Sequence, residues 1–131
     1  MPFLSITRLR VRSVRFLPPF LWYATASARQ ARRSAGCHGV RLRRTSRGAF
    51  WTLSRWDDES AMKAFRGRSP HRDAMARLAR WCDEASYAHW LEPSDEWPTW
   101  EQGAQRLATT GRLSKVDHPS AEQAQGRIVI T

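Results

Sequence analysis

The chain has 131 residues, 41% of them hydrophobic and 11% aromatic, which is enough to bury the core of one domain and argues against disorder. The longest apolar stretch near the N-terminus, residues 16–26, is too short to cross a bilayer and contains Pro18 and Pro19. Cys37 and Cys82 form neither a disulfide framework nor a pattern of metal ligands. We therefore expect two packed thiols in a cytoplasmic protein, no metal site and no membrane span.

Positive charge is concentrated in the N-terminal half. The formal net charge is +10, and residues 1–54 hold eleven arginines without any Asp or Glu. An Arg-rich, acid-free half of this kind can bind nucleic acid or another anionic surface, or act as a targeting peptide. Its arginines can also simply form the solvated face of strands. Arg8, Arg10 and Arg12 alternate with Leu9 and Val11, so we favour a solvated strand face and do not expect nucleic acid as a partner.

Residues 3–56 predict a strand, a helix and two further strands. Residues 3–14 are expected to form a strand with bulges near Thr7 and Ser13, ended by Pro18 and Pro19. Small apolar residues recur every three or four positions over residues 20–35, which predicts a helix stopped by Gly36. Residues 37–45 and 50–56 then predict a hairpin, with its turn at residues 46–48.

The second half predicts helices with recognisable start signals. We expect Asp57 to cap one helix, and Ser69 to cap a second one that has Pro70 in its first turn. A strand over residues 86–92 follows. Thr99 and Gln102 predict a capping box for a helix that Gly111 ends. Residues 128–130 are expected to add an edge strand or to pair with another subunit.

This order of elements, βαββαβ, predicts an α+β fold of the ferredoxin-like type with an antiparallel sheet. We expect one such domain over residues 1–116, followed by a C-terminal tail, residues 117–131, that acts as an edge or exchanged strand. If the helices cover only one face of the sheet, the other face remains apolar and open. A second copy of the chain is the simplest cover, so a homodimer is expected.

Several short motifs point to a family. They are Leu53-Ser54-Arg55-Trp56, Ala61-Met62-Lys63-Ala64-Phe65, His71-Arg72-Asp73-Ala74-Met75 and Trp97-Pro98-Thr99-Trp100-Glu101. Over residues 48–120 the chain resembles uncharacterised bacterial domains related to the antibiotic-biosynthesis monooxygenases, and over residues 1–47 it resembles them by pattern alone. The resemblance implies a dimeric α/β barrel in which two sheets pack face to face. It also implies several activities, because that superfamily includes cofactor-free oxygenases, haem-binding enzymes, isomerases and proteins without assigned activity.

Two residues are candidates for catalysis. His71 begins an apolar helical row with Met75, Leu78 and Cys82, and its imidazole can serve as a base, a proton shuttle or a haem ligand. The structural alternative is a histidine at a helix start that is satisfied by the backbone. Arg55 can stabilise a developing enolate or phenolate if it converges with His71 or with an indole N–H.

Aromatic side chains are the candidates for a ligand pocket. Six of the seven tryptophans lie at or beyond position 51, and such rings can wall a flat apolar ligand. The alternative is that they form the core and the dimer interface. The expected pocket residues are Trp51, Trp81, His89 and Trp90.

Two classes of function follow. The first is a small-molecule monooxygenase acting on an aromatic, polyketide or carotenoid-like compound, with either haem or no cofactor. The second is a non-catalytic protein that carries a small apolar ligand or binds nucleic acid through its basic half.

Overall fold

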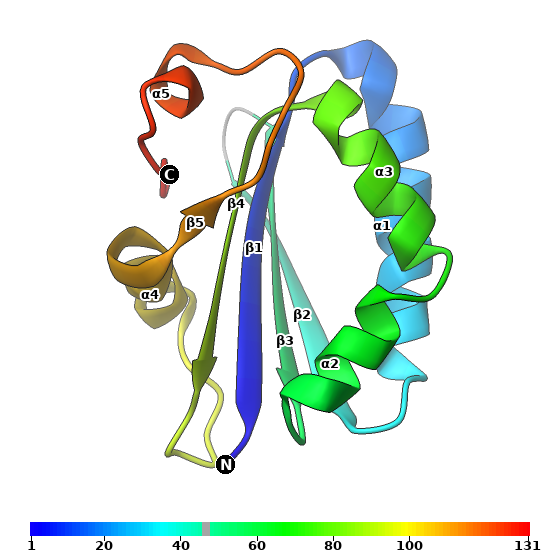
Figure 1. The fold of residues 1–131 in the computed structure, drawn as a ribbon, viewed down its shortest axis with the longest axis vertical. Coiled ribbons are helices and arrows are strands. Elements are labelled where there is room, and N and C mark those ends of the chain that lie inside the picture. The colour runs from blue at the N-terminus through cyan, green and yellow to red at the C-terminus, as the bar shows by residue number, and fades with distance from the viewer. Residues whose placement is uncertain (46–47) are drawn as a thin grey trace.

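The computed structural model describes residues 1–45 and 48–131, which form an antiparallel sheet with helices on both sides (Figure 1). The described strands are β1 (Phe3–Val11), β2 (Cys37–Thr45), β3 (Ala49–Trp56), β4 (Cys82–Leu91) and the short β5 (Arg112–Leu113), arranged in the order β2-β3-β1-β4-β5. The helices that follow the ferredoxin-like order are α1 (Leu17–Arg32), α2 (Glu59–Arg66) and α3 (His71–Trp81). The predicted α+β ferredoxin-like class is therefore confirmed. Residues 46 and 47, at the predicted hairpin turn, lie outside the described part of the chain.

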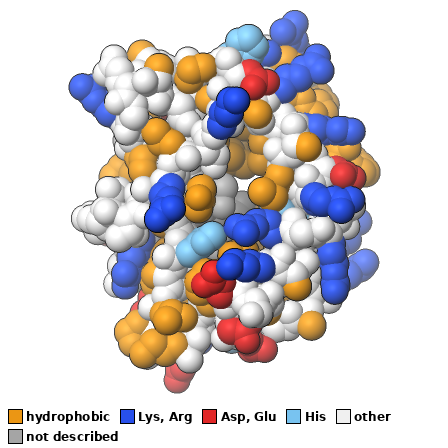
Figure 2. Space-filling model, in the orientation of Figure 1, with side chains coloured by type: hydrophobic (Ala, Val, Ile, Leu, Met, Phe, Trp, Pro, Cys, Tyr) orange, Lys and Arg blue, Asp and Glu red, His pale blue; other side chains and the backbone are white. Residues whose placement is uncertain are grey.

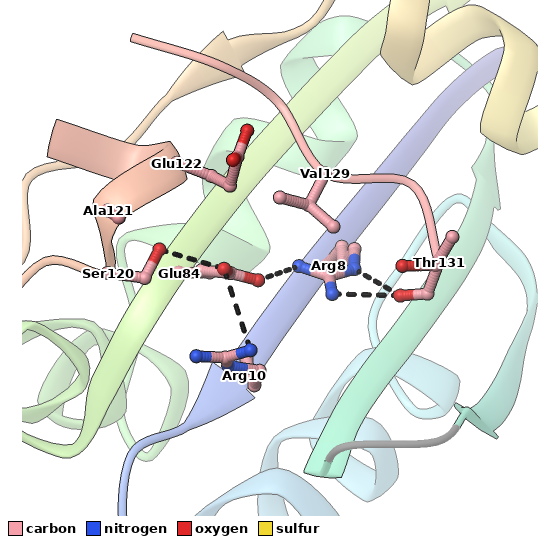
Figure 3. Close-up of a pocket in the computed structure, with 8 residues that line it drawn as sticks. All are labelled: Arg8, Arg10, Glu84, Ser120, Ala121, Glu122, Val129 and Thr131. Atoms are coloured by element: carbon pink, nitrogen blue, oxygen red, sulfur yellow. Dashed lines mark hydrogen bonds and ion pairs between the residues drawn. The ribbon is translucent and has the colours of Figure 1, made fainter. Parts of the chain in front are cut away.

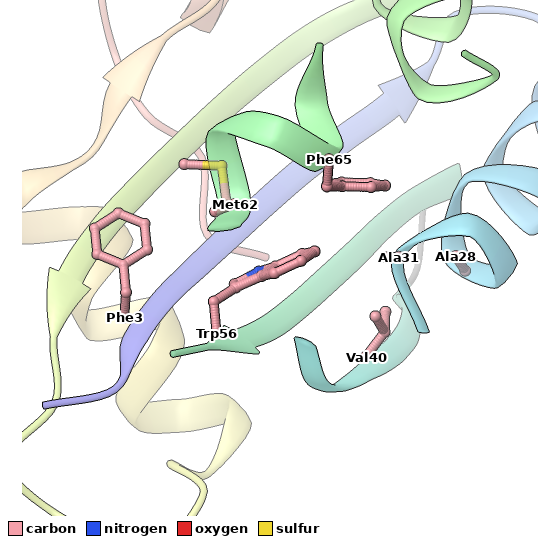
Figure 4. Close-up of a cluster of buried hydrophobic side chains, with 7 residues drawn as sticks. All are labelled: Phe3, Ala28, Ala31, Val40, Trp56, Met62 and Phe65. Carbon is pink, nitrogen blue, oxygen red and sulfur yellow. The ribbon is translucent and has the colours of Figure 1, made fainter. Parts of the chain in front are cut away.

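The first face of the sheet is the side that carries α1, α2 and α3 (Figure 1). Trp56 is completely buried there and its ring stacks on that of Phe65, with centroids 5.2 Å apart. The small side chains of Ala28 and Ala31 allow α1 to approach the sheet closely. The buried cluster comprises Phe3, Ala28, Ala31, Val40, Trp56, Met62 and Phe65 (Figure 4).

The second face carries α4 (Trp100–Thr110), α5 (Ala121–Ala124) and the C-terminal tail (Figure 1). Leu107 of α4 is fully buried against Leu4, Ile6, Trp51, Leu53, Ala88 and Trp90. Gly103 lies so close to the sheet that an added Cβ would stand 2.7 Å from Ile6 Cδ1. The expectation that this face lies open is therefore wrong, because α4 and the tail of the same chain cover much of it.

The N-terminal boundaries differ from the prediction. Pro18 and Pro19 occupy the first turn of α1, where a missing N–H removes no helical hydrogen bond, so they begin the helix instead of only ending a strand. A short 3₁₀ turn, Val14–Phe16, precedes them, and α1 ends at Arg32. The register of β1 is continuous at Thr7. It shifts instead between Arg10 and Val11, in the pairing with β4.

The predicted caps are partly wrong. Asp58, not Asp57, caps α2 by accepting a hydrogen bond from the Ala61 N–H at 2.8 Å, and Asp57 instead pairs with His38 at 2.6 Å. Pro70 stands at the cap position of α3 after a cis peptide bond, and no side-chain cap is made there. The capping box of Thr99 and Gln102 is confirmed.

The fourth strand is longer than predicted. It begins directly at Cys82, so Asp83 and Glu84 belong to β4 and Cys82 is not part of the helical row of His71. Within residues 117–131, all of which the structure describes, α5 is present and no strand is formed. Ile128 packs on the second face, and the exchanged strand stays a prediction. None of the described helices is long and apolar enough to cross a membrane.

Candidate functional site

The six residues predicted to form a site are divided between the two faces of the sheet. Successive strand residues point to opposite faces, so His89 and Trp90 on β4 cannot line the same pocket. Trp51 and Trp90 lie in the cluster of the second face, whereas Trp81 lies in a cluster with Phe16 and Phe20 of the first. The second face holds Trp51, Arg55 and Trp90, and the first holds His71, Trp81 and His89. His71 and Arg55 therefore do not converge, which was the condition for Arg55 to act together with His71.

His71 has a structural environment at the start of α3. Its backbone N–H donates to Gln30 Oε1 at 2.9 Å, and its Nδ1 lies 3.5 Å from the carbonyl oxygen of Arg66. Its ring packs on Phe65 with centroids 4.5 Å apart. Burial lowers the pKa of His71, the hydrogen bond to Arg66 raises it, and the charge of Arg66 lowers it again. These contacts of the ring and the backbone are those that the structural alternative requires.

His89 is also part of the packing on the first face. Its ring lies 5.4 Å from that of Phe3 and 5.3 Å from that of Tyr87, measured between centroids. Burial is the main cause that lowers the pKa of His89, and the charge of Arg66 acts in the same direction. Among residues 1–45 and 48–131, no group of three or more His, Cys, Asp or Glu side chains could hold a metal ion.

Arg55 lies on the second face but is engaged elsewhere. Its Nη1 donates to the carbonyl oxygen of Asp95, in the loop before α4. Its Nε is buried and has no hydrogen-bond partner in the described part of the chain. Trp51 is four residues away on the same strand, which corresponds to about 13 Å. The Trp51 indole donates instead to Thr45 Oγ1 at 3.2 Å.

A buried ionic cluster occupies the second face near the start of β4 (Figure 3). Arg8, expected on a solvated strand face, is only 2% exposed, so that expectation is wrong. Its Nη1 donates to Glu84 Oε1 at 2.9 Å. A buried charge needs such a partner, because losing hydration in the interior is otherwise too unfavourable. Arg8 and Glu84 come from the neighbouring strands β1 and β4.

The cluster extends from this pair toward solvent. Arg10 binds Asp83 through two hydrogen bonds, of 2.9 and 2.7 Å, and its Nη1 lies 3.7 Å from Glu84 Oε2. Ser120 Oγ donates to the same Glu84 oxygen at 2.8 Å. Glu84 therefore contacts Arg8, Arg10 and Ser120. The positive charges of the two arginines are matched by the negative charges of Asp83 and Glu84.

A cavity of about 230 Å³ opens beside this cluster. The other edge of the Arg8 guanidinium donates from Nε and Nη2 to the main-chain oxygen of Thr131, at 3.0 and 2.8 Å. Arg8 Cζ also lies 5.9 Å from the centroid of the Trp51 ring. The lining residues are Arg8, Arg10, Glu84, Ser120, Ala121, Glu122, Val129 and Thr131 (Figure 3).

This geometry can bind an anionic or carbonyl oxygen. A planar guanidinium with two parallel N–H groups recognises one oxygen or a carboxylate with defined direction. Burial of Arg8 strengthens the interaction, and the buried Trp51 ring lies next to the guanidinium without lining the cavity itself. We therefore take Arg8, Trp51 and the cavity next to them as the candidate site, which the sequence pattern did not reveal. Assigning Asp83 and Glu84 to β4, opposite the arginines of β1, would have revealed it.

A second hollow of about 480 Å³ lies between α4 and the segment that follows β4. Trp90 donates its indole N–H to Glu92 Oε2 at 3.0 Å, and Arg106 stands 5.3 Å from the Trp90 ring. Trp97 also lines this hollow and is covered by Arg41 at 4.3 Å. Arg106 faces the Trp90 ring here and, in the described lining of this hollow, no guanidinium is seen to direct two N–H groups at one oxygen, so we take it as the weaker candidate.

The arginines of the basic half mostly contact aromatic rings or carbonyl groups. Besides Arg41, Arg43 lies 6.0 Å from the Trp100 ring, and Arg32 donates to the carbonyl oxygen of Val40. Figure 2 shows Lys and Arg side chains along the edge of the molecule on which α1 and α3 lie. These contacts account for part of the positive charge through packing.

Comparison with solved structures shows the fold. Rv0793 from Mycobacterium tuberculosis aligns with a TM-score of 0.65 and 19% identity, over 75% of this chain and 100% of that one. A mutant form of SnoaB, a cofactor-independent oxygenase from Streptomyces nogalater, aligns with a TM-score of 0.61 and 13% identity, over 75% and 98%. An antibiotic biosynthesis monooxygenase aligns with a TM-score of 0.62 and 10% identity, over 70% and 99%.

Sequence comparison identifies the family. No protein with a curated description matches this chain significantly. Residues 15–116, well over half of the chain, match the profile of a domain of unknown function, DUF3291. The chain therefore belongs to the DUF3291 family, and its structure is related to those of the antibiotic-biosynthesis monooxygenases.

Proposed function

We propose that the protein is a small-molecule oxygenase that binds an aromatic or polyketide-like substrate on the second face of its sheet and needs no cofactor. The observation that carries this proposal is the buried Arg8 guanidinium beside Trp51, which directs two N–H groups at one oxygen, in this structure that of Thr131. The fold shared with SnoaB, a cofactor-independent oxygenase, supports the same activity.

The proposed chemistry uses Arg8 to stabilise charge on the substrate. An enolisable ketone or a phenol that loses a proton places negative charge on its oxygen, where the two N–H groups of Arg8 would bind it. The carbon that shares this charge then forms a bond to O₂, and the resulting hydroperoxide loses water to leave a carbonyl group. One CH₂ group and O₂ are thereby converted into C=O and H₂O.

Anthrone is a suitable test substrate, because its oxidation to anthraquinone follows this stoichiometry. We expect the protein to accelerate O₂ consumption above the rate in buffer, with anthraquinone as product. Arg8→Lys keeps the positive charge next to Glu84 but loses the two parallel N–H groups of the guanidinium. We expect it to lower the rate of O₂ consumption about 100-fold. Arg112→Met, an exposed change on β5, is the control. A rate for Arg8→Lys equal to that of the unmodified protein would refute the assignment.

A non-catalytic ligand carrier is the second candidate. It is favoured because the two carboxylates that line the cavity are already paired with other side chains. Glu84 is bound by Arg8, Arg10 and Ser120, and Glu122 lies 3.5 Å from Arg127, so both are engaged by cations. Their oxygens are already occupied by these contacts, which leaves them less free to contact a substrate. Binding of anthrone without O₂ consumption would support the carrier and exclude the oxygenase.

A homodimer in the cytoplasm completes the proposal. The dimer is proposed from the likeness of the fold to the antibiotic-biosynthesis monooxygenase type, since α4 and the tail cover the face that first suggested it. The compartment is proposed from the free thiols of Cys37 and Cys82. Native mass spectrometry tests the subunit number. All residues of the candidate site come from one chain, so a monomer would refute the dimer and leave the site complete.

A further inference from the structure

The last five residues of the chain, 127–131, lie across the second face and reach the candidate site (Figure 3). Ile128 packs against the apolar cluster that includes Leu107, and Val129 and Thr131 line the cavity. The main-chain oxygen of Thr131 accepts both N–H groups from the outer edge of Arg8. An oxygen of the protein itself therefore occupies the position that a ligand oxygen would take.

The segment before residue 127 is attached to the sheet by different contacts. Gln123 is buried and binds the N–H and the C=O of Ala85, each at 3.3 Å, and the C=O of Ser114 at 2.8 Å. The N–H of Ser120 donates to the carbonyl oxygen of Asp83. Gly126 follows with a φ of 78°, a conformation that glycine adopts easily. Residues 127–131 can therefore leave the face while α5 stays in place, once Arg127 releases its main-chain hydrogen bond of 2.9 Å and its ion pair of 3.5 Å with Glu122.

We propose that residues 127–131 form an internal plug of the Arg8 site, which a ligand must displace before it binds. This inference rests on the proposed function, because it concerns the same site. The plug also defines the ligand class. The ligand carries a carbonyl or carboxylate oxygen that replaces Thr131 on Arg8, and next to it an apolar body that replaces Val129 and Ile128.

The size of the cavity agrees with this exchange. With the plug in place it measures about 230 Å³, whereas sites for drug-sized ligands typically measure about 300–1,000 Å³. A multi-ring substrate therefore fits only after the plug has moved. Displacement of the plug costs few hydrogen bonds, because Arg8 exchanges the Thr131 oxygen for a ligand oxygen and stays paired with Glu84.

The plug lowers the apparent affinity by the fraction of molecules in which it is seated. A substitution that loosens it should therefore strengthen ligand binding. Ile128→Ser removes the half-buried apolar anchor, and Ile130→Ser makes the same chemical change at a side chain that is 39% exposed. With 2-naphthoate as the probe, we expect Ile128→Ser to bind roughly tenfold more tightly than the unmodified protein, and Ile130→Ser to bind equally.

Hydrogen exchange of the free protein tests the plug without a ligand. We expect the buried Nε–H of Arg8, which donates to the Thr131 oxygen, to exchange slowly in the unmodified protein and in Ile130→Ser, and rapidly in Ile128→Ser. Rapid exchange in the unmodified protein would overturn the plug. Equal affinity of the unmodified protein and Ile128→Ser for 2-naphthoate would overturn it too, while leaving the proposed site standing. Slow exchange of the Arg8 Nε–H with no binding of 2-naphthoate by either protein would overturn the proposed site and, with it, the role of the plug in ligand binding.

Discussion

At the scale of single residues, the Arg8–Glu84 pair is the feature on which the site depends. A buried ion pair adds little net stability when complete, but breaking it leaves an uncompensated charge in the interior. We expect Glu84→Gln to lower the free energy of unfolding by about 3 kcal/mol. Glu101→Gln, at an exposed position of α4, is the matched control and should change it by less than about 0.5 kcal/mol. Urea denaturation measures both, and equal stability of the two variants would contradict the buried pair.

The two first-face histidines make stability depend on pH. Because burial holds the pKa of His71 and His89 below the ordinary value of 6.5, the folded protein binds protons there less readily than the unfolded chain. Their contribution to the free energy of unfolding is complete above about pH 6.5. It is lost as the pH falls from that value through the lowered pKa of the folded state.

Replacing His71 should weaken this pH dependence. We expect His71→Gln to lose less unfolding free energy than the unmodified protein between about pH 7.5 and about pH 5.5. His118→Gln, at an exposed position, is the control. Denaturation curves at the two pH values give the comparison. An identical decrease in the unmodified protein and in His71→Gln would show that His71 does not titrate as its burial requires.

The residues also show why the site could not be read from the sequence. Alternation of Arg8, Arg10 and Arg12 with apolar residues identifies a strand with two faces, but it does not say which face is covered. The decisive partners of Arg8 and Arg10 lie more than 70 positions away, at Asp83 and Glu84. Such pairing becomes visible only once the register of β1 and β4 is known.

At the scale of elements, α4 covers the second face of a sheet that already has helices on its first face. Its start is fixed by the reciprocal hydrogen bonds of Thr99 and Gln102, of 3.1 and 2.9 Å. We expect Thr99→Ala to lower the free energy of unfolding by about 1 kcal/mol, because one cap acceptor is lost. Thr109→Ala, at the exposed end of α4, is the control. A loss in thermal denaturation no larger than that of the control would contradict the capping role.

Elements with strong local signals were predictable, and those decided by tertiary contacts were not. The capping box identified the start of α4 because its hydrogen bonds are all local. Pro18 and Pro19 were ambiguous, since proline both ends strands and begins helices. Cys82 to Ala85 continue a helical pattern in sequence, but pairing with β1 makes them a strand. Tertiary pairing overrides local preference at such junctions.

At the scale of the whole molecule, the strand order followed from the sequence and the covering of the second face did not. A βαββαβ order with one antiparallel sheet leaves few arrangements, and the ferredoxin-like class was confirmed, with the short β5 as an unexpected addition. The docking of α4 depends on Gly103, whose missing side chain lets the helix approach Ile6. Glycine within a helix gives no such signal in advance. The six candidate residues were separated because alternate strand positions and the helices of the first face place them on opposite sides of the sheet.

The central claim is that a ligand binds on the second face, beside Arg8 and Trp51, and not among the histidines of the first face. The most direct test is a proton–nitrogen correlation spectrum recorded while 2-naphthoate is added. We predict that the indole N–H signal of Trp51 and the Nε–H signal of Arg8 shift, while the indole signals of Trp56 and Trp81 on the first face stay in place. Shifts confined to Trp56, Trp81 and the backbone around His71 would contradict the account.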